Sequence, residues 1–419
     1  MINMKALTIF GFLTLSIFSY SQERFVSMSG QIVDLKSDEP LSFATINIKG
    51  TQNGVVTNEE GYFDFSFPES YSSDSITASM VGYEKLTLPI KPLLKKEFVE
   101  LKMTTKPFML EEVVVTPGKE LQAAEIIELV RKNIPSHYPQ KPFVMEAFYR
   151  DYKVEDGRCV GLLEASVSIY DKGYKKTPNP HSLQEKVKLN QVRKSLSNDF
   201  KGNVLTNQNI MKGFLSLNDI RYRHRWLSKR FKKHYQYEKD GYAFINEKLH
   251  YVIKATSSDW AFKIYVEAEN FMVPKIEMSY EWEDDVLENE WTLYDSIRIE
   301  QRWAKEILEF QEIDGQWLPK VHLFQFNNVT YDIKTNEKLA VTEVRQEFLV
   351  NHVDLDDTEK IQKAERMDEY QPLHLQAASY DAEFWKNYNV IKLHPRDKKL
   401  IKDLEDRMNI EEQFSTTNE

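Results

Sequence analysis

The sequence contains almost no cysteine: Cys159 is the only one in 419 residues. A single thiol cannot form an intramolecular disulfide, so ordinary hydrophobic cores must stabilise the fold. A lone cysteine is far more often a small buried apolar side chain than a catalytic thiol, and we expect Cys159 to be buried.

The motifs of common catalytic centres are also missing. The sequence has no Gly-x-Ser-x-Gly turn and no glycine-rich phosphate loop, and none of its nine histidines begins a His-x-x-Glu zinc pair. His181 and Glu185, like His234 and Glu238, stand four residues apart, but this spacing arises readily by chance. The acidic run at residues 281–290 lacks the spacing of a calcium loop. The sequence therefore predicts a protein that is not an enzyme, with no catalytic, cofactor-binding or metal-ligating residue.

An excess of positive charge is absent as well. The chain has 55 basic and 65 acidic residues and a net charge of −10, which argues against nucleic-acid binding because phosphate neutralisation needs clustered positive charge. One basic stretch with interleaved aromatic residues contains Arg221, Arg223, Arg225, Lys229, Arg230, Lys232 and Lys233. It suits an anionic lipid headgroup, lipopolysaccharide phosphates or an acidic partner. The simpler interpretation is a solvated face whose aromatic side packs inward.

Long apolar runs are missing outside the N-terminus. Residues 6–20 are almost entirely apolar and follow Lys5. Because a membrane-spanning helix needs about 20 apolar residues, this pattern predicts a signal peptide at residues 1–21, with an uncleaved anchor as the alternative. The remainder, in a chain with 29% charged residues, is expected to be water-soluble or peripherally attached to a membrane.

Short alternating polar and apolar stretches, separated by glycine- and proline-containing turns, follow the apolar run. They predict a small antiparallel β-sandwich. Four blocks occur in order: GQIVD at 30–34, PLSFATI at 40–46, GVVTNEEGYF at 54–63 and GY at 82–83. With these blocks, residues 27–102 resemble the carboxypeptidase regulatory-like domain. The resemblance implies a seven-stranded, transthyretin-like accessory module, often found at the N-terminus of TonB-dependent outer-membrane receptors, that serves adhesion or support rather than chemistry.

Residues 103–122 are expected to form a linker, which resembles the segment after this module in those receptors. It contains Val113, Val114 and Val115, followed by Pro117 and Gly118. The three valines have two interpretations: a strand that adds to a partner's sheet edge, as a TonB-box-like peptide does, or the last strand of the sandwich. The second is the simpler, because the proline and glycine would end that strand.

Residues 123–353 predict a second, larger module. Apolar residues at helical spacing indicate an amphipathic helix from residue 123 that stops at Pro135. Strand patterns that predict an antiparallel sheet follow at 143–152, 160–170, 243–253, 262–268, 275–280, 293–300, 317–327 and 341–349. The rhythm of residues 240–350 is similar to the LolA/LolB-like lipoprotein carriers, in which a strongly curved antiparallel sheet wraps a helix. Residues 171–235 fit this pattern poorly and are expected to be an insertion.

The second module is rich in aromatic residues, which are expected to build its core and would otherwise line an apolar groove. They include Trp260, Tyr265, Phe271, Trp291, Trp303, Phe310, Trp317, Phe324 and Phe326. Residues 354–419 form a charged tail, expected to be helical at 380–389 and 401–408. Phe384, Trp385 and Tyr388 would fall on one side of the first helix and dock it on the core.

Together these patterns predict a mainly β protein, with an N-terminal seven-stranded β-sandwich followed by a curved antiparallel sheet with flanking helices (α+β). We expect an exported, non-catalytic accessory or binding protein of the periplasm or outer membrane of a Gram-negative cell, without a cofactor. Its expected partners are envelope proteins, lipids or glycans. Two alternatives stay open: a lipid or lipoprotein carrier predicts a continuous apolar cavity, and a hydrolase with an unrecognised site predicts a cleft where titratable groups converge.

Overall fold

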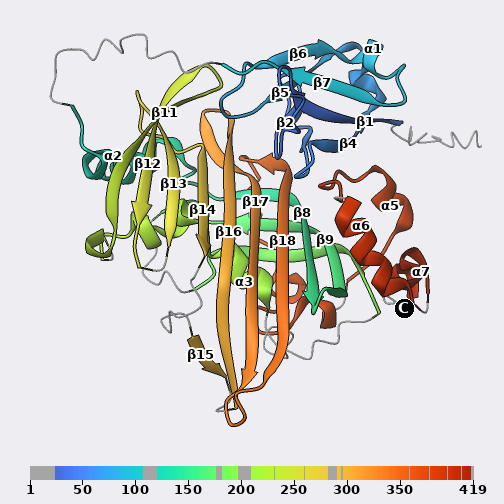
Figure 1. The fold of residues 1–419 in the computed structure, drawn as a ribbon. Coiled ribbons are helices and arrows are strands. Elements are labelled where there is room, and N and C mark those ends of the chain that lie inside the picture. Colours follow the sequence, from blue (N-terminus) through green and yellow to red (C-terminus); the bar gives the residue numbers. More distant parts are fainter. Residues whose placement is uncertain are drawn as a thin grey trace, which may run out of the picture.

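The computed structural model describes residues 24–106, 120–175, 182–196, 209–230, 232–258, 260–281, 290–293, 296–357, 359–376, 378–393, 395–406 and 408–416 (Figure 1). The predicted signal peptide at residues 1–21 and the three valines Val113, Val114 and Val115 lie outside these residues. The described chain is mainly β, as the sequence predicts.

The first module is a seven-stranded β-sandwich. Its elements are β1 (Phe25–Asp34), β2 (Thr45–Ile48), β3 (Gly54–Val56), β4 (Tyr62–Pro68), β5 (Ser75–Ser79), β6 (Leu86–Pro89), the short helix α1 (Ile90–Leu93) and β7 (Val99–Met103). One sheet has the order β4-β1-β7 and the other β3-β2-β5-β6. Alternation along β4 buries Phe63, Phe65 and Phe67 between the sheets. The sequence predicts an antiparallel sandwich, but β1 pairs with β7 in parallel. This one pairing departs from the prediction.

Gly30 of β1 lies beside Val99 of the neighbouring strand β7. A Cβ atom at this position would lie 2.2 Å from the Val99 carbonyl oxygen and 2.7 Å from the ring of Phe63. Both distances are far below van der Waals contact, so any side chain would displace β7 or the ring.

The second module is one antiparallel sheet of 11 strands. The strands are β8 (Phe143–Glu155), β9 (Arg158–Asp171), β10 (Lys186–Lys194), β11 (Gln236–Ile245), β12 (Lys248–Thr256), β13 (Ala261–Glu267), β14 (Lys275–Glu281), β15 (Glu290–Leu293), β16 (Ile297–Ile313), β17 (Gln316–Asp332) and β18 (Lys338–Asp354). Their order is β10-β9-β8-β18-β17-β16-β14-β13-β12-β11, with β15 paired to β16. The long strands β16, β17 and β18 therefore stand in the middle of the sheet (Figure 1).

The sheet corrects three predictions. The expected strand at 243–253 is a hairpin of β11 and β12, because Asn246 and Glu247 adopt left-handed conformations with φ of 48° and 67° and turn the chain. The expected strand at 293–300 is likewise divided between β15 and β16. Residues 171–235 are not simply an insertion, because they supply β10, which pairs with β9 at the edge of the sheet.

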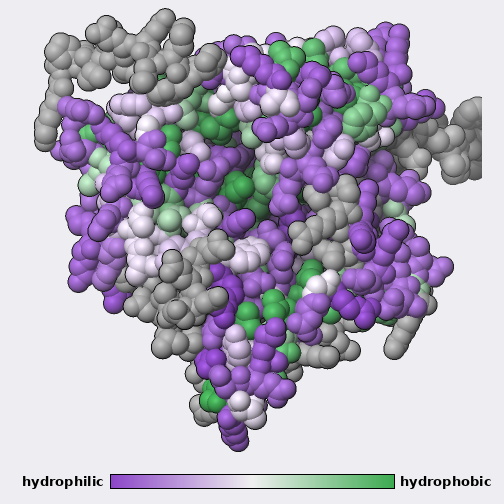
Figure 2. Space-filling model, in the orientation of Figure 1, coloured by the Kyte–Doolittle hydropathy of each residue, from purple (hydrophilic) through white to green (hydrophobic). Residues whose placement is uncertain are grey.

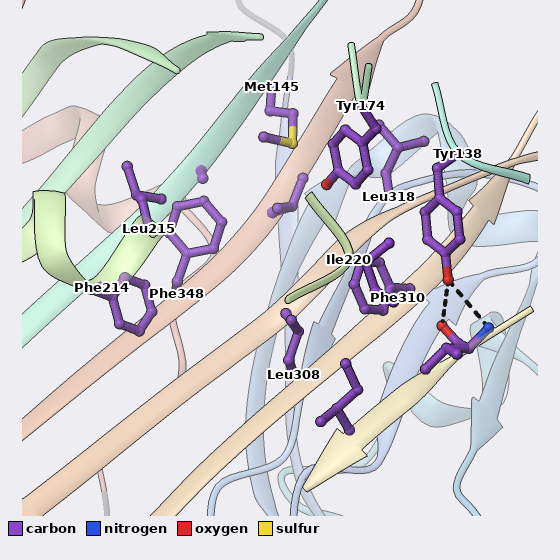
Figure 3. Packing of buried hydrophobic residues seen from close by; sticks show 14 of the residues in the cluster. Tyr138, Met145, Tyr174, Phe214, Leu215, Ile220, Leu308, Phe310, Leu318 and Phe348 are labelled. Atoms are coloured by element: carbon purple, nitrogen blue, oxygen red, sulfur yellow. Dashed lines mark hydrogen bonds between the residues drawn. The ribbon is translucent and has the colours of Figure 1, made fainter. Parts of the chain in front are cut away.

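Helices α2 (Ala123–His137), α3 (Ile210–Leu215) and α4 (Asp219–Tyr222) cover one face of the sheet. Phe214, Leu215 and Ile220 pack there against side chains of the long strands (Figure 3). α2 continues two residues beyond Pro135, its predicted end, because the last turn closes when the Tyr138 N–H donates to the Ile134 carbonyl at 3.0 Å. No helix of the described part is long and apolar enough to span a bilayer.

The sandwich and the tail cover the opposite face of the same sheet. Strand alternation turns Phe148 and Leu349 away from the helices, and both pack with Val56 of the sandwich and Trp385 of the tail. The tail helices are α5 (Ala382–Asn387), α6 (Pro395–Ile401) and α7 (Ile410–Thr416). The helix predicted at 401–408 is therefore displaced: α6 ends at Ile401 and continues only as a 3-10 turn.

Candidate functional site

The basic stretch predicted as a ligand patch is divided by the fold, and its first arginine points inward. Arg221 is 1% exposed, and its guanidinium donates to both carboxylate oxygens of Asp171, at 2.7 and 2.9 Å. This paired geometry satisfies a buried charge on both sides. Arg221 therefore ties α4 to the end of β9 and is not a contact for an outside ligand.

Arg225 is also a structural residue. It donates to Asp219 at 2.8 Å and to Glu306 of β16 at 2.7 Å. The indole N–H of Trp226 donates to the same Asp219 at 2.7 Å, and His322 completes the cluster on Glu306. This network fixes residues 219–226 to the middle of the sheet.

Arg223 contributes little to an exposed patch either. It adopts a left-handed conformation with φ of 53°, and its guanidinium donates to the Tyr174 carbonyl oxygen at 2.7 Å. Partial burial and the neighbouring Arg221 lower its pKa. Arg221, Arg223 and Arg225 are therefore not part of an exposed patch. Their guanidinium groups donate to acceptors inside the protein that come from other parts of the chain.

The remaining basic residues are on the surface. Lys229, Arg230, Lys232 and Lys233 are exposed. The three lysines border a groove of about 980 Å³ along α2, together with Lys132 and Arg131 of that helix. We call this feature the lysine groove.

The floor of the lysine groove is apolar. It is formed by side chains of α2, of the segment just before α2, and of the residues around the start of β11, namely Leu121, Ala124, Ile127, Leu129, Tyr235 and Tyr237. Tyr237 is held in place because its hydroxyl donates to the Trp226 carbonyl oxygen at 2.6 Å. Trp226 therefore contacts both features: its indole belongs to the buried arginine network, and its carbonyl oxygen holds Tyr237 of the groove.

The rim of the lysine groove carries an excess of positive charge. Five basic side chains and two carboxylates, Glu125 and Glu128, line it. Glu128 pairs with Arg131 at 2.6 Å and with Lys232 at 3.4 Å, and the hydrogen bond from Arg131 contributes most to the lowered pKa of Glu128. Within the described part of the chain, Lys229 and Lys233 have no ion-pair partner. An apolar floor below unpaired ammonium groups is suited to an anionic amphiphile.

Other titratable clusters in the described residues include buried ion pairs. Arg150, for example, is 1% exposed and donates to Glu347 at 2.6 Å and to Glu164 at 2.5 Å. Among these residues, no three His, Cys, Asp or Glu side chains are placed to hold a metal ion. Cys159 is buried, as expected, and burial raises the pKa of its thiol to about 12.

The sequence patterns missed part of the site. They predicted α2 as an amphipathic helix, and Ile126, Val130 and Ile134 on its inner side are buried. Ala124 and Lys132 on its other side are exposed and line the groove instead. The amphipathic period of α2 contains this second face, but only the fold shows that the lysines of residues 229–233 lie beside it.

The sandwich has a match among known protein families. Residues 28–115 match the family model of the CarboxypepD_reg-like domain. This confirms the resemblance found in the sequence blocks, and we use that name for the sandwich. No curated protein matches the chain significantly.

Two solved structures illustrate the similarity of the second module. A LolA superfamily protein from Nitrosomonas europaea is 14% identical, with a TM-score of 0.23, and the match covers 60% of this chain and 100% of that one. A DUF1329 family protein from Desulfovibrio piger is 10% identical, with a TM-score of 0.25, and the match covers 57% of this chain and 96% of that one. The LolA superfamily is thus among the matches, as the strand rhythm predicted, but TM-scores of this size say nothing about function.

Proposed function

We propose that this chain is a non-catalytic binding protein of the Gram-negative cell envelope, which attaches to anionic lipid through the lysine groove. The observation that carries the proposal is the combination of an apolar floor with two exposed lysines, Lys229 and Lys233, that have no acidic partner among the described residues. Each lysine close to an anionic membrane surface contributes about 1 kcal/mol of attraction. Apolar contact adds about 25 cal/mol per Å² removed from water.

The envelope location has separate support. The apolar run at residues 6–20 has the length of an export signal, and the CarboxypepD_reg-like domain resembles modules that accompany outer-membrane receptors. A chain exported in this way would meet phospholipid and lipopolysaccharide phosphates, which are the anions that the groove suits.

Surface attachment fits the described residues better than internal carriage. The carrier alternative needs a continuous apolar cavity on the helix-covered side of the sheet. Trp226, Phe214 and Tyr138 fill that side, and each is at most 1% exposed. Figure 3 shows Phe214 and Tyr138 packed among their neighbours in this core. A carrier would have to displace this core to admit an acyl chain.

Vesicle flotation tests the proposal directly. The purified protein is mixed with vesicles of phosphatidylcholine alone or of phosphatidylcholine with phosphatidylglycerol, and we expect it to float only with the anionic vesicles. A triple variant, Lys229→Gln with Lys232→Gln and Lys233→Gln, should lose this flotation. The matched control is Lys334→Gln with Lys338→Gln and Lys360→Gln, which removes the same charge at exposed sites outside the groove.

Equal flotation of the two triple variants would contradict the groove as the attachment site. Flotation with neutral vesicles as strong as with anionic ones would contradict the choice of ligand. Thermal unfolding of both variants shows whether either change disturbs the fold.

A further inference from the structure

A second cavity lies between the two modules and shares no residue with the lysine groove. It has a volume of about 710 Å³. One wall is the outer face of the β3-β2-β5-β6 sheet, and the other is the β16–β17 hairpin with the end of β18. Figure 2 shows this side of the molecule, where the surface below the CarboxypepD_reg-like domain is hollowed. We call this cavity the inter-module cleft.

The wall from the CarboxypepD_reg-like domain is polar but uncharged where it is formed by β2 and β5. Strand alternation buries Ile46 and Ile48 in the sandwich and turns Asn47 and Thr45 outward. Thr77 and Ser79 of β5 stand beside them. The side-chain oxygen of Asn47 is buried against Gly54, where an added Cβ atom would lie 1.8 Å from it, and no described residue donates to it. The hydroxyl groups of Thr45, Thr77 and Ser79 are therefore the polar groups of this wall that suit ligand hydroxyls.

The wall from the curved sheet combines aromatic and charged groups. Trp317 is half-buried and lines the cleft beside Phe310. Glu312 and Asp314 are exposed at the hairpin end of the same wall. The cleft therefore has aromatic side chains on the wall from the curved sheet and hydroxyl and amide groups on the wall from the CarboxypepD_reg-like domain. The carboxylates of Glu312 and Asp314 lie at its edge.

Lys320 supplies the one deeply buried charge of the cleft lining. Its ammonium donates to the Val350 carbonyl oxygen at 3.1 Å, and no carboxylate of the described residues forms an ion pair with it. Lys275 provides the contrast, because that buried lysine contacts Glu277 at 3.0 Å and Glu309 at 2.9 Å. An unpaired buried charge is destabilising, so its presence at a cleft points to an anion from outside.

The backbone explains why Lys320 reaches the cleft. In the β16–β17 ladder, Glu309 pairs with Val321 and Phe310 pairs with Pro319, which leaves Lys320 as the extra residue of a β-bulge. Bulges redirect a side chain that regular pairing would place elsewhere and are common beside binding sites. Burial lowers the pKa of this ammonium to about 8.

We infer that the inter-module cleft binds an acidic sugar, whose anionic group lies on the Lys320 ammonium, whose ring lies against Trp317 and whose hydroxyls meet the hydroxyl groups of β2 and β5. A carboxylate and a phosphate would both satisfy the lysine, so a uronic acid and a sugar phosphate share the required chemistry. Glycans of the cell envelope contain both. This inference is independent of lipid attachment at the lysine groove.

Calorimetric titration with glucuronate, glucose 6-phosphate, glucose and inorganic phosphate tests the inference. We expect at least one of the acidic sugars to bind about tenfold or more tightly than glucose and than phosphate alone, a difference of about 1.4 kcal/mol. The stronger of the two acidic sugars identifies the anionic group. The triple lysine variant of the groove should bind the sugar like the unchanged protein.

Lys320→Met should abolish the preference for the acidic sugar, and Trp317→Ala should weaken its binding. Lys320→Gln provides a second, polar replacement, and Lys334→Met is the matched control at an exposed turn. Thermal unfolding of the Lys320 variants at or above the temperature of the unchanged protein shows that the fold is intact. The inference is overturned if no acidic sugar binds at millimolar concentration, if glucose binds equally well, or if Lys320→Met binds like the unchanged protein.

Discussion

Gln52 and Val353 exchange two hydrogen bonds across the boundary between the modules. The Gln52 side-chain amide donates to the Val353 carbonyl oxygen at 2.9 Å, and the Val353 N–H donates back to the Gln52 oxygen at 2.7 Å. Gln52 thus takes the place of a neighbouring strand for the end of β18. A similar exchange joins Asn389 of the tail to Ser66 of β4, with both bonds at 2.9 Å.

Gln52→Ala should lower the free energy of unfolding by about 1–3 kcal/mol, because it leaves the buried N–H of Val353 without an acceptor. Urea denaturation followed by tryptophan fluorescence measures the change. The control is Gln236→Ala, at the exposed start of β11, which should alter stability by no more than about 0.5 kcal/mol. Equal effects of the two variants would mean that the contact between the modules contributes nothing.

Arg225→Met should destabilise the protein by about 3–5 kcal/mol, because it leaves Asp219 and Glu306 charged and buried without their partner. Lys229→Met removes a neighbouring positive charge from the surface and should cost less than about 0.5 kcal/mol. Parallel chemical denaturation of the two variants checks this contrast. A small effect of Arg225→Met would contradict the structural role of this ion-pair network.

The Glu185 carboxyl should make stability fall as the pH rises. Burial, followed by repulsion from Asp171, raises its pKa from 4.5 to about 7 in the folded protein. The folded state therefore holds a proton between about pH 4.5 and 7 that the unfolded state releases, and the stability that this proton provides is lost as the pH rises through about 7. Glu185→Gln cannot titrate and still accepts a hydrogen bond from Tyr222. Unfolding free energies measured from pH 4.5 to 8 should decline less in this variant, and identical slopes would refute the prediction.

Attachment to anionic vesicles should weaken steeply with added salt, because exposed charges are screened within about 10 Å at 0.1 M ionic strength. The triple lysine variant should show a shallower salt dependence. Leu121→Ser, on the floor of the groove, should weaken attachment at every salt concentration and leave the slope unchanged. Vesicle co-sedimentation over a range of sodium chloride concentrations separates the two contributions. The same slope in all three proteins would show that the lysines do not contact the lipid.

Local sequence patterns predicted many of the strands and helices. Period-two alternation predicted the short strands of the sandwich, and helical spacing located α2, because one buried face imposes each of these periods. The boundaries failed where the conformation of a turn decided them. The turn at Asn246 and Glu247 divides the strand expected at 243–253 into β11 and β12, although these two residues can be read as a turn signal in the sequence.

The sequence by itself determined that both modules are rich in strands and to which class the first belongs, because periodicity and turn chemistry act between neighbouring residues. Only the tertiary structure decided the meaning of the charges. Arg221 and Lys229 belong to one basic stretch. Arg221 is buried in an ion pair with Asp171, whereas Lys229 has no ion-pair partner in the described part of the chain. Lys320 looks ordinary in the sequence, but in the fold it is a buried cation beside a cleft, without an acidic partner among the described residues. Whether a charge is neutralised depends on partners that come from distant residues, and only folding brings these together.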